Sequence, residues 1–192
     1  MASIAPFLFG KLPAHVDFVS RGLGDPEREG WDHWASRAMD RLGADDETAA
    51  RLHGEVPPWR FVAGPSVLGE GWRVGALAPS IDRAGRRFIA VLGLGGLSPG
   101  AASGAGFAAA AGIEDLLYQA IGERLTAEEA VTALDGFAQS FASNLALAEA
   151  LDGRPASEGL WWTEADRDDP RTGALPPADL LVAGHREALH AG

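Results

Sequence analysis

The chain has 192 residues and no cysteine, with 46% hydrophobic and 22% charged residues and a formal net charge of −11. This composition is that of one globular domain, and it excludes disulfides, cysteine zinc sites and thiol nucleophiles. The negative charge argues against nucleic acid or an anionic membrane surface as the main partner, because both attract clustered positive charge.

The N-terminal residues predict a short buried strand over Phe7–Phe9, which Gly10 ends. The start of the chain carries no basic segment and is interrupted by Pro6, which is atypical of a signal peptide. The longest apolar stretch, Phe88–Leu97, is shorter than the about 20 residues that span a bilayer. We therefore expect a cytoplasmic protein that does not insert into a membrane.

Helical and extended patterns alternate along the next part of the chain. Apolar residues at helical spacing predict a helix from Glu29, and a second short helix is expected over Asp46–Leu52, before the break at Pro57. Three strands are expected next: Trp59–Ala63, Trp72–Leu77 and Phe88–Leu94. Gly85 favours a hairpin turn over Asp82–Arg86, between the second and the third of them.

The second half of the chain predicts a helix over Ala108–Arg124 and another from Thr126 to about Leu151, opened by a capping box between Thr126 and Glu129. A strand, an acidic loop and a last helix are expected after them: Gly159–Thr163, Asp166–Gly173, and Pro177 to about Leu189. Because helices and strands are interleaved, the sequence predicts an α/β layered domain. We expect one domain over residues 1–192, with a mixed central sheet covered by helices on both faces.

Lys11 is the only lysine among 16 basic residues, and it lies in a compact block, Phe9–Val19, where an apolar strand meets a turn. His15 and Asp17 of this block could form an acid/base pair with Ser80 or with Lys11, although no nucleophile elbow is present. The alternative is structural: Asp17 caps a turn or pairs with a nearby arginine, and His15 is an ordinary loop residue.

The predicted hairpin tip carries the guanidinium groups of Arg83, Arg86 and Arg87 beside Asp82. Arginine binds phosphate and carboxylate groups with two parallel hydrogen bonds, so the tip is a candidate contact for a phosphopeptide or an acidic partner. A charged hairpin tip that Asp82 holds in place explains the same residues.

Two further motifs match known sites only in part. Gly93–Ser98 looks like half of a dinucleotide-binding loop, but Ser98 stands at its third glycine position and Pro99 delays the following helix. The acidic run Asp166–Asp169 suggests a hard cation but lacks the spacing of a calcium loop. A flexible connection and a solvated loop are the simpler interpretations, and we expect no metal ion and no cofactor.

The six tryptophans mostly fall in predicted elements and are expected to pack in the core. Trp161 and Trp162 are adjacent in a strand, so their side chains should point to opposite faces. We expect one of them to be exposed, or covered by a helix or a partner. Both, together with Arg83 and Arg87, are candidate partner-binding residues.

Short sequence blocks follow one another in a characteristic order along nearly the whole chain. They are Gly10-Lys11-Leu12-Pro13, Asp17-Phe18-Val19, Arg21-Gly22-Leu23, Trp31-Asp32-x-Trp34, Pro58-Trp59-Arg60-Phe61, Pro79-Ser80-Ile81-Asp82-Arg83-Ala84-Gly85-Arg86 with Phe88, Leu160-Trp161-Trp162-Thr163, and Gly173-Ala174-Leu175-Pro176. In this order they resemble TagF, a family of regulators associated with type VI secretion. One departure is Val16, where the family usually has glycine, because a β-branched residue does not accept positive φ well.

The resemblance implies a three-layer α/β/α sandwich and a cytoplasmic repressor of type VI secretion that acts after translation by binding another protein. The implied partner is the forkhead-associated-domain scaffold protein of that system. The resemblance also implies a family-motif polar cluster, whose members are Lys11, Asp17, Arg60, Ser80, Asp82 and Arg86.

The alternative is a small hydrolase-like enzyme, with a polar cleft formed by Lys11, Asp17, Ser80, Asp82 and Arg86. An enzyme needs a concave pocket with convergent polar groups, whereas a binding module needs an exposed patch that is apolar at its centre. We favour a non-enzymatic regulator because the sequence contains no well-formed catalytic motif. If Lys11, Asp17, Asp82 and Arg86 act together, they should lie close together in the fold.

Overall fold

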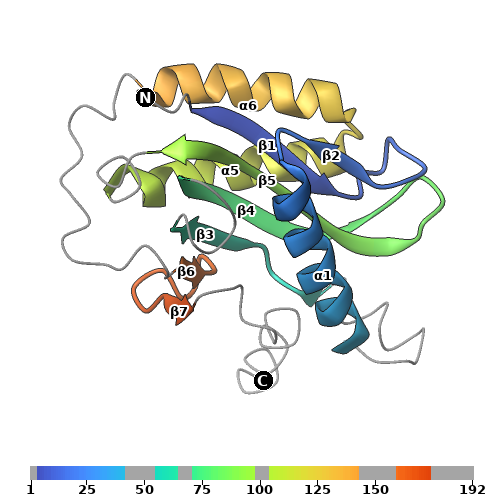
Figure 1. Cartoon of the computed structure of the whole chain (residues 1–192), viewed down its shortest axis with the longest axis horizontal. Coiled ribbons are helices and arrows are strands. Elements are labelled where there is room, and N and C mark those ends of the chain that lie inside the picture. The colour runs from blue at the N-terminus through green and yellow to red at the C-terminus, as the bar shows by residue number, and fades with distance from the viewer. Residues whose placement is uncertain (1–3, 42–54, 65–70, 98–103, 143–158, 174–192) are drawn as a thin grey trace.

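The computed structural model of the chain describes residues 4–41, 55–64, 71–97, 104–142 and 159–173. Within these residues, seven strands form one sheet in the order β2-β1-β5-β4-β3-β6-β7 (Figure 1). The strands are β1 Ala5–Gly10, β2 Val19–Arg21, β3 Trp59–Ala63, β4 Trp72–Ile81, β5 Arg87–Leu97, β6 Gly159–Trp162 and β7 Arg171–Gly173. The helices are α1 Asp25–Arg41, α5 Gly104–Gly122 and α6 Ala127–Ala142.

All strand pairs of the described sheet are antiparallel, so the predicted mixed sheet is wrong. A mixed sheet was the expectation because a helix between two strands usually connects parallel neighbours. Here, no described helix connects neighbouring strands. Helix α1 leads from β2 to β3 past three intervening strands, and α5 and α6 together lead from β5 to β6 past two.

The glycine-rich stretch Gly93–Leu97 belongs to β5, which corrects both interpretations of it, as a phosphate-binding loop and as a flexible connection. It pairs with β1 on one side and with β4 on the other. A Cβ atom added to Gly93 would lie only 2.5 Å from the ring of Phe7 in β1. The glycine therefore makes room for an aromatic side chain of the neighbouring strand.

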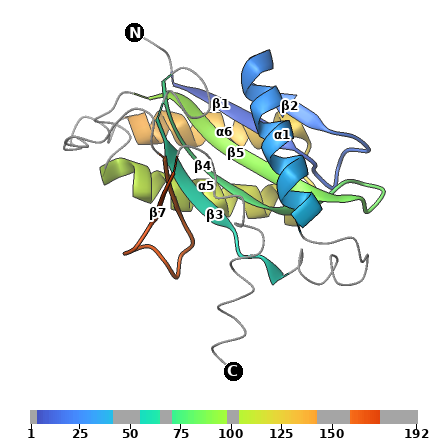
Figure 2. The same ribbon diagram turned by 60° about the horizontal axis from the view of Figure 1, so that its bottom comes forward.

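The helices lie on both faces of the sheet (Figure 2). On one face, Trp31 and Trp34 of α1 pack in a buried cluster with Phe61 of β3. On the other face, Ile113 of α5 and Leu134 of α6 pack in a second buried cluster with strand residues. Burial of apolar surface on both faces is the main favourable term in the stability of such a fold. None of the described helices is long and apolar enough to cross a membrane.

The predicted hairpin between β4 and β5 is confirmed. Gly85 has a positive φ of 81° in its turn, which is a conformation that glycine adopts without steric cost. Gly10, at the end of β1, has a φ of 117°, and a Cβ atom there would lie 2.1 Å from the carbonyl oxygen of Ile89. This close approach lets the next amide, that of Lys11, donate a hydrogen bond of 3.0 Å to the same oxygen.

Some element boundaries differ from the sequence-based expectation. Helix α1 begins at Asp25 instead of Glu29. Asp25 and Glu27 lie in its first turn, where a negative charge interacts favourably with the helix dipole. The short edge strands β2 and β7 have no counterpart among the predicted elements, and β7 occupies the end of the predicted acidic loop. The predicted helices over Asp46–Leu52 and from Pro177 lie outside the described residues.

Helix α6 opens with the predicted capping box. The Oε2 atom of Glu129 accepts a hydrogen bond of 2.8 Å from the amide of Thr126, and the Thr126 hydroxyl accepts one of 3.2 Å from the amide of Glu129. The helix begins at Ala127 and is described to Ala142, so its predicted extension to Leu151 lies outside the described residues.

Candidate functional site

The lysine of the first block and the aspartate of the hairpin meet in the fold. Lys11 follows β1 and Asp82 follows β4, with β5 between these strands, and their Nζ and Oδ2 atoms lie 3.2 Å apart. Arg86 donates from its Nε atom to the same Oδ2 at 2.6 Å. Only 6% of Lys11 and 1% of Asp82 are exposed. Three of the four residues that were expected to lie close together therefore do so, and we call them the Lys11–Asp82–Arg86 cluster; the contact of the fourth, Asp17, is described below.

Asp82 also holds the hairpin turn. Its Oδ1 atom accepts hydrogen bonds of 2.9 Å from the amides of Ala84 and Arg86. Burial alone would raise the pKa of Asp82. However, the hydrogen bonds from the Arg86 amide and from the side chains of Lys11 and Arg86 outweigh burial and lower its pKa to about 2, from an ordinary value of 3.8. The carboxylate is therefore ionised at neutral pH with both oxygens engaged.

Further hydrogen bonds tie the β1–β2 loop to its neighbours. The amide of Arg83 donates to the carbonyl of His15 at 2.7 Å, and Nη2 of Arg86 donates to the carbonyl of Val16. The Nε2 atom of His15 accepts a hydrogen bond of 2.9 Å from the amide of Ala127, where α6 begins. One network therefore joins the β1–β2 loop, the β4–β5 hairpin and the N-terminus of α6. Val16 does not have positive φ, so this turn does not require the glycine usual in the family.

The Lys11 ammonium supports an aromatic side chain at the surface. Its Nζ atom lies 5.0 Å from the ring centroid of Phe18 and 6.0 Å from that of Phe88. The two rings meet edge to face with their centroids 4.7 Å apart. Phe18 is nevertheless 48% exposed. Cation–π and aromatic contacts therefore hold this exposed ring in a defined position.

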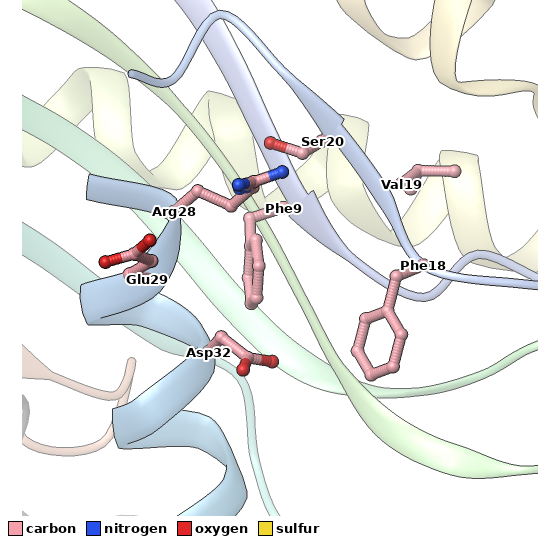
Figure 3. Close-up of a pocket in the computed structure, with 7 residues that line it drawn as sticks. All are labelled: Phe9, Phe18, Val19, Ser20, Arg28, Glu29 and Asp32. Atoms are coloured by element: carbon pink, nitrogen blue, oxygen red, sulfur yellow. The ribbon is translucent and has the colours of Figure 1, made fainter. Parts of the chain in front are cut away.

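A groove of about 350 Å³ lies between the end of the β1–β2 loop and α1 (Figure 3). It was not predicted from the sequence. Its lining residues are Phe9, Phe18, Val19, Ser20, Arg28, Glu29 and Asp32. A signal was present in α1, where Asp25, Arg28, Glu29 and Asp32 follow the i, i+3, i+4, i+7 spacing of one helix face. That polar stripe places charged groups along one side of the groove, which we call the α1 groove.

Two other residues of the family motif make their contacts elsewhere. Asp17 is exposed, and its Oδ1 atom accepts a hydrogen bond of 2.8 Å from the amide of Phe18, as a turn residue does. Ser80 is 3% exposed, and its hydroxyl has no hydrogen-bond partner among the described residues. Ser80 lines a second pocket of about 250 Å³ together with Tyr118 of α5. Among the described residues, no hydrogen bond therefore joins the Ser80 hydroxyl to His15 or Asp17.

Arg60 belongs to a separate buried cluster. Its Nε and Nη2 atoms donate to the two carboxylate oxygens of Glu114 at 2.9 and 3.3 Å, and its Nη1 atom donates to Glu164. Burial lowers the pKa of Arg60, but the two carboxylates outweigh burial and raise it. Burial and the charge of Glu114 also raise the pKa of Tyr118. The ion pairs of Arg60 connect β3 with α5 and with Glu164, two residues beyond the end of β6.

Trp161 and Trp162 point to opposite faces of β6, as predicted, but both are fully buried. The ring of Trp161 stacks on Phe61 with centroids 5.1 Å apart, and Trp162 packs in the cluster beneath α5 and α6. Both faces of β6 are covered within the fold, so neither side chain lies at its surface, and their partner-binding role stays a prediction. Arg83 is exposed and Arg87 is half-buried, and their binding role stays a prediction.

The acidic loop is held by its own hydrogen bonds. The Oδ2 atom of Asp166 accepts from the Thr163 hydroxyl at 2.8 Å, and the Asp166 amide donates to that hydroxyl at 3.3 Å. Within the described ranges, no group of three or more metal-ligating side chains lies close enough to hold an ion.

The Lys11→Met substitution should lower the thermal unfolding midpoint by about 5–10 °C, because it leaves the buried Asp82 carboxylate without its lysine. Asp17→Ala is the control and should lower it by no more than about 3 °C, since it removes one exposed hydrogen bond. Circular dichroism melts of both variants measure the difference. Equal midpoints in the two variants would show that the buried ion pair does not stabilise the fold.

Asp82→Asn should remove a pH-dependent part of the stability. Because folding lowers the pKa of Asp82 to about 2, its contribution is fully present above the ordinary pKa of 3.8 and is lost as the pH falls toward 2. The difference in unfolding midpoint between wild type and Asp82→Asn should therefore shrink as the pH falls from 6 to about 2. A difference that stays constant over this range would contradict a stabilising charge at Asp82.

Arg60→Met should cost about 3–5 kcal/mol of unfolding free energy, because Glu114 is then buried without its cation. The double variant Arg60→Met/Glu114→Leu should recover most of this loss, since both charges are replaced by apolar groups. Urea unfolding curves of the two variants measure the recovery. A double variant as unstable as Arg60→Met would mean that the lost packing of Arg60, and not an unpaired carboxylate, causes the destabilisation.

The chain matches the family described as TagF N-terminal domain, type VI secretion system-associated, over residues 8–137. None of the curated proteins matches it. Among solved structures, it is similar to the crystal structure of PA0076 from Pseudomonas aeruginosa PAO1, with 25% sequence identity, a TM-score of 0.63, and coverage of 94% of this chain and 93% of that chain. The family match spans more than half of the sequence and includes Lys11, Arg60, Asp82 and Arg86. The chain therefore belongs to the TagF N-terminal domain family of type VI secretion system-associated proteins.

Proposed function

We propose that this protein is a negative regulator of type VI secretion that acts after translation, by binding another component of the system. The observation that carries the proposal is that polar side chains of the first block and of the β4–β5 hairpin turn are engaged within the fold. Lys11 and Arg86 are both bonded to Asp82, and His15 and Asp17 accept hydrogen bonds from backbone amides. These groups stabilise loops at a surface, and they are not left available for proton transfer or nucleophilic attack.

The proposed partner is the forkhead-associated-domain scaffold protein of the secretion system, which the regulator would meet in the cytoplasm. Family membership supports the link to type VI secretion, and the resemblance of the sequence blocks supports this partner. The net charge of −11 favours a protein partner over nucleic acid or an anionic membrane surface.

The proposal includes a single domain over residues 1–192 with a three-layer α/β/α arrangement. Two separate buried clusters support it, one with α1 and one with α5 and α6. In this arrangement the sheet and helices would form a scaffold that holds loops from distant parts of the sequence at one common surface.

A small enzyme is the alternative use of the same residues. It would need the buried hydroxyl of Ser80 to be activated by a neighbouring base. Lys11 and Asp82 are the residues of the family motif that could act as this base. They form an ion pair with each other, and neither lines the pocket that Ser80 lines. Regulation by binding is therefore the better supported function.

Deletion of this protein should raise effector secretion without changing the transcript levels of the secretion genes, and overproduction should suppress secretion. The scaffold protein should co-purify with the wild-type protein. Complementation with Ser80→Ala should restore repression, because a binding protein tolerates the loss of one hydroxyl inside a pocket. Secretion assays and co-purification at matched protein abundance measure these outcomes.

One result would overturn the proposal. If Ser80→Ala is stable and still binds the scaffold protein but has lost all repression, an essential chemical group has been removed. Loss of a residue that acts in the chemical step lowers rates by orders of magnitude, whereas loss of one contact weakens binding only in part. The enzyme would then be the better account.

A further inference from the structure

We propose that the α1 groove is the docking site for a partner segment that carries a large apolar side chain next to basic residues. This inference rests on the proposed function, because a regulator that acts by binding needs a contact surface. It names that surface and the chemistry of the segment that fits it.

The floor and one edge of the groove are apolar. Phe9 is 3% exposed and lies at the bottom of the groove (Figure 3). The Val19 side chain instead packs in the buried cluster on the other face of the sheet. The half-exposed ring of Phe18 forms the edge, with its centroid 6.5 Å from that of Phe9. A volume of about 350 Å³ admits a large apolar side chain. The groove therefore has the apolar centre that protein interfaces require.

The wall on α1 is negatively charged. Arg28 pairs with Asp25 at 3.2 Å within the helix, so its positive charge is offset. Glu29 and Asp32 are exposed, and neither makes an ion pair within the described part of the chain. In Figure 3, Asp32 extends from α1 toward the side of the groove where Phe18 lies. Two carboxylates that form no ion pair with another described residue, beside an apolar floor, fit an apolar side chain flanked by arginine or lysine.

The Lys11–Asp82–Arg86 cluster holds this surface in place before any partner arrives. Lys11 lies 5.0 Å from the centroid of the Phe18 ring, and Asp82 keeps Lys11 in position. The Phe18 ring also contacts the ring of Phe88, and the backbone amide of Phe18 donates a hydrogen bond to Asp17. A surface ordered in advance loses less conformational entropy on binding. The buried lysine of the family motif therefore acts as a positioning residue for the groove.

The charge of the whole molecule selects the same kind of partner. A net charge of −11 repels an acidic segment and attracts a basic one, which favours both encounter and correct pairing. The groove also lies beside β2, which is an edge strand of the described sheet. An extended basic-apolar segment of a protein is the occupant that these features favour.

Fluorescence anisotropy with two fluorescein-labelled synthetic peptides tests the inference. One peptide carries a central phenylalanine between arginines, and the other carries glutamate in place of each arginine. The purified full-length protein should bind the first peptide and not the second, and added salt should weaken the binding. Glu29→Gln/Asp32→Asn and Phe18→Ser should each weaken binding of the basic peptide by about tenfold or more.

Two matched variants serve as controls. Asp168→Asn/Asp169→Asn removes two exposed carboxylates of the acidic loop, and Tyr118→Ser removes an exposed aromatic ring on α5. Both should bind the basic peptide as the wild type does, and melting curves should show that all variants are folded. The inference is wrong if the two peptides bind equally well, or if the control variants weaken binding as much as the groove variants.

Co-purification separates this inference from the proposed function. If the groove variants retain the scaffold protein and repress secretion as the wild type does, the groove is not the docking site, while the regulatory function stands. If the wild type binds the basic peptide through the groove but neither retains the scaffold protein nor represses secretion, the proposed function fails and the groove stands.

Discussion

The ion pair between Lys11 and Asp82 joins the ends of two strands that are not neighbours in the sheet. An unpaired buried charge is strongly destabilising, so each of the two groups needs the other. The same carboxylate closes the β4–β5 turn, and the same ammonium lies near the Phe18 ring. A local change at either residue would therefore reach the hairpin, the β1–β2 loop and the α1 groove together. If the proposed function is right, the polar residues that first suggest catalysis form the framework of a binding surface.

The rest of the architecture keeps that framework rigid. Aromatic side chains of α1 pack on one face of the sheet, while α5 and α6 cover the other. At the start of α6, the hydrogen bond from the Ala127 amide to His15 joins the β1–β2 loop to this helix. The Arg60–Glu114 pair fastens α5 to β3 in a similar way. Both faces of the sheet thus contribute to the position of one exposed edge, which is what the proposed binding function requires.

Features that depend on neighbouring residues could be predicted from the sequence, and features that depend on distant contacts could not. The capping box at Thr126 and the hairpin turn at Gly85 follow from local bonds, and both are confirmed. Strand directions were missed because they depend on which strands pair across the sheet, which periodicity does not contain. The alternation of side chains along a strand correctly placed Trp161 and Trp162 on opposite faces of the sheet. Their burial, however, depends on elements far away in the sequence. The α1 groove arises between an edge strand and a helix, so only its polar stripe was visible.

The most direct test of this account is a double-mutant cycle that measures the unfolding free energy of Lys11→Met, Asp82→Asn and the double variant. If the two side chains support each other in the folded state, removal of the second should cost far less once the first is gone. The loss in the double variant should then be clearly smaller than the sum of the two single losses. Losses that add within experimental error would contradict the account, because they would mean that Lys11 and Asp82 act independently and that the surface around Phe18 does not depend on their contact.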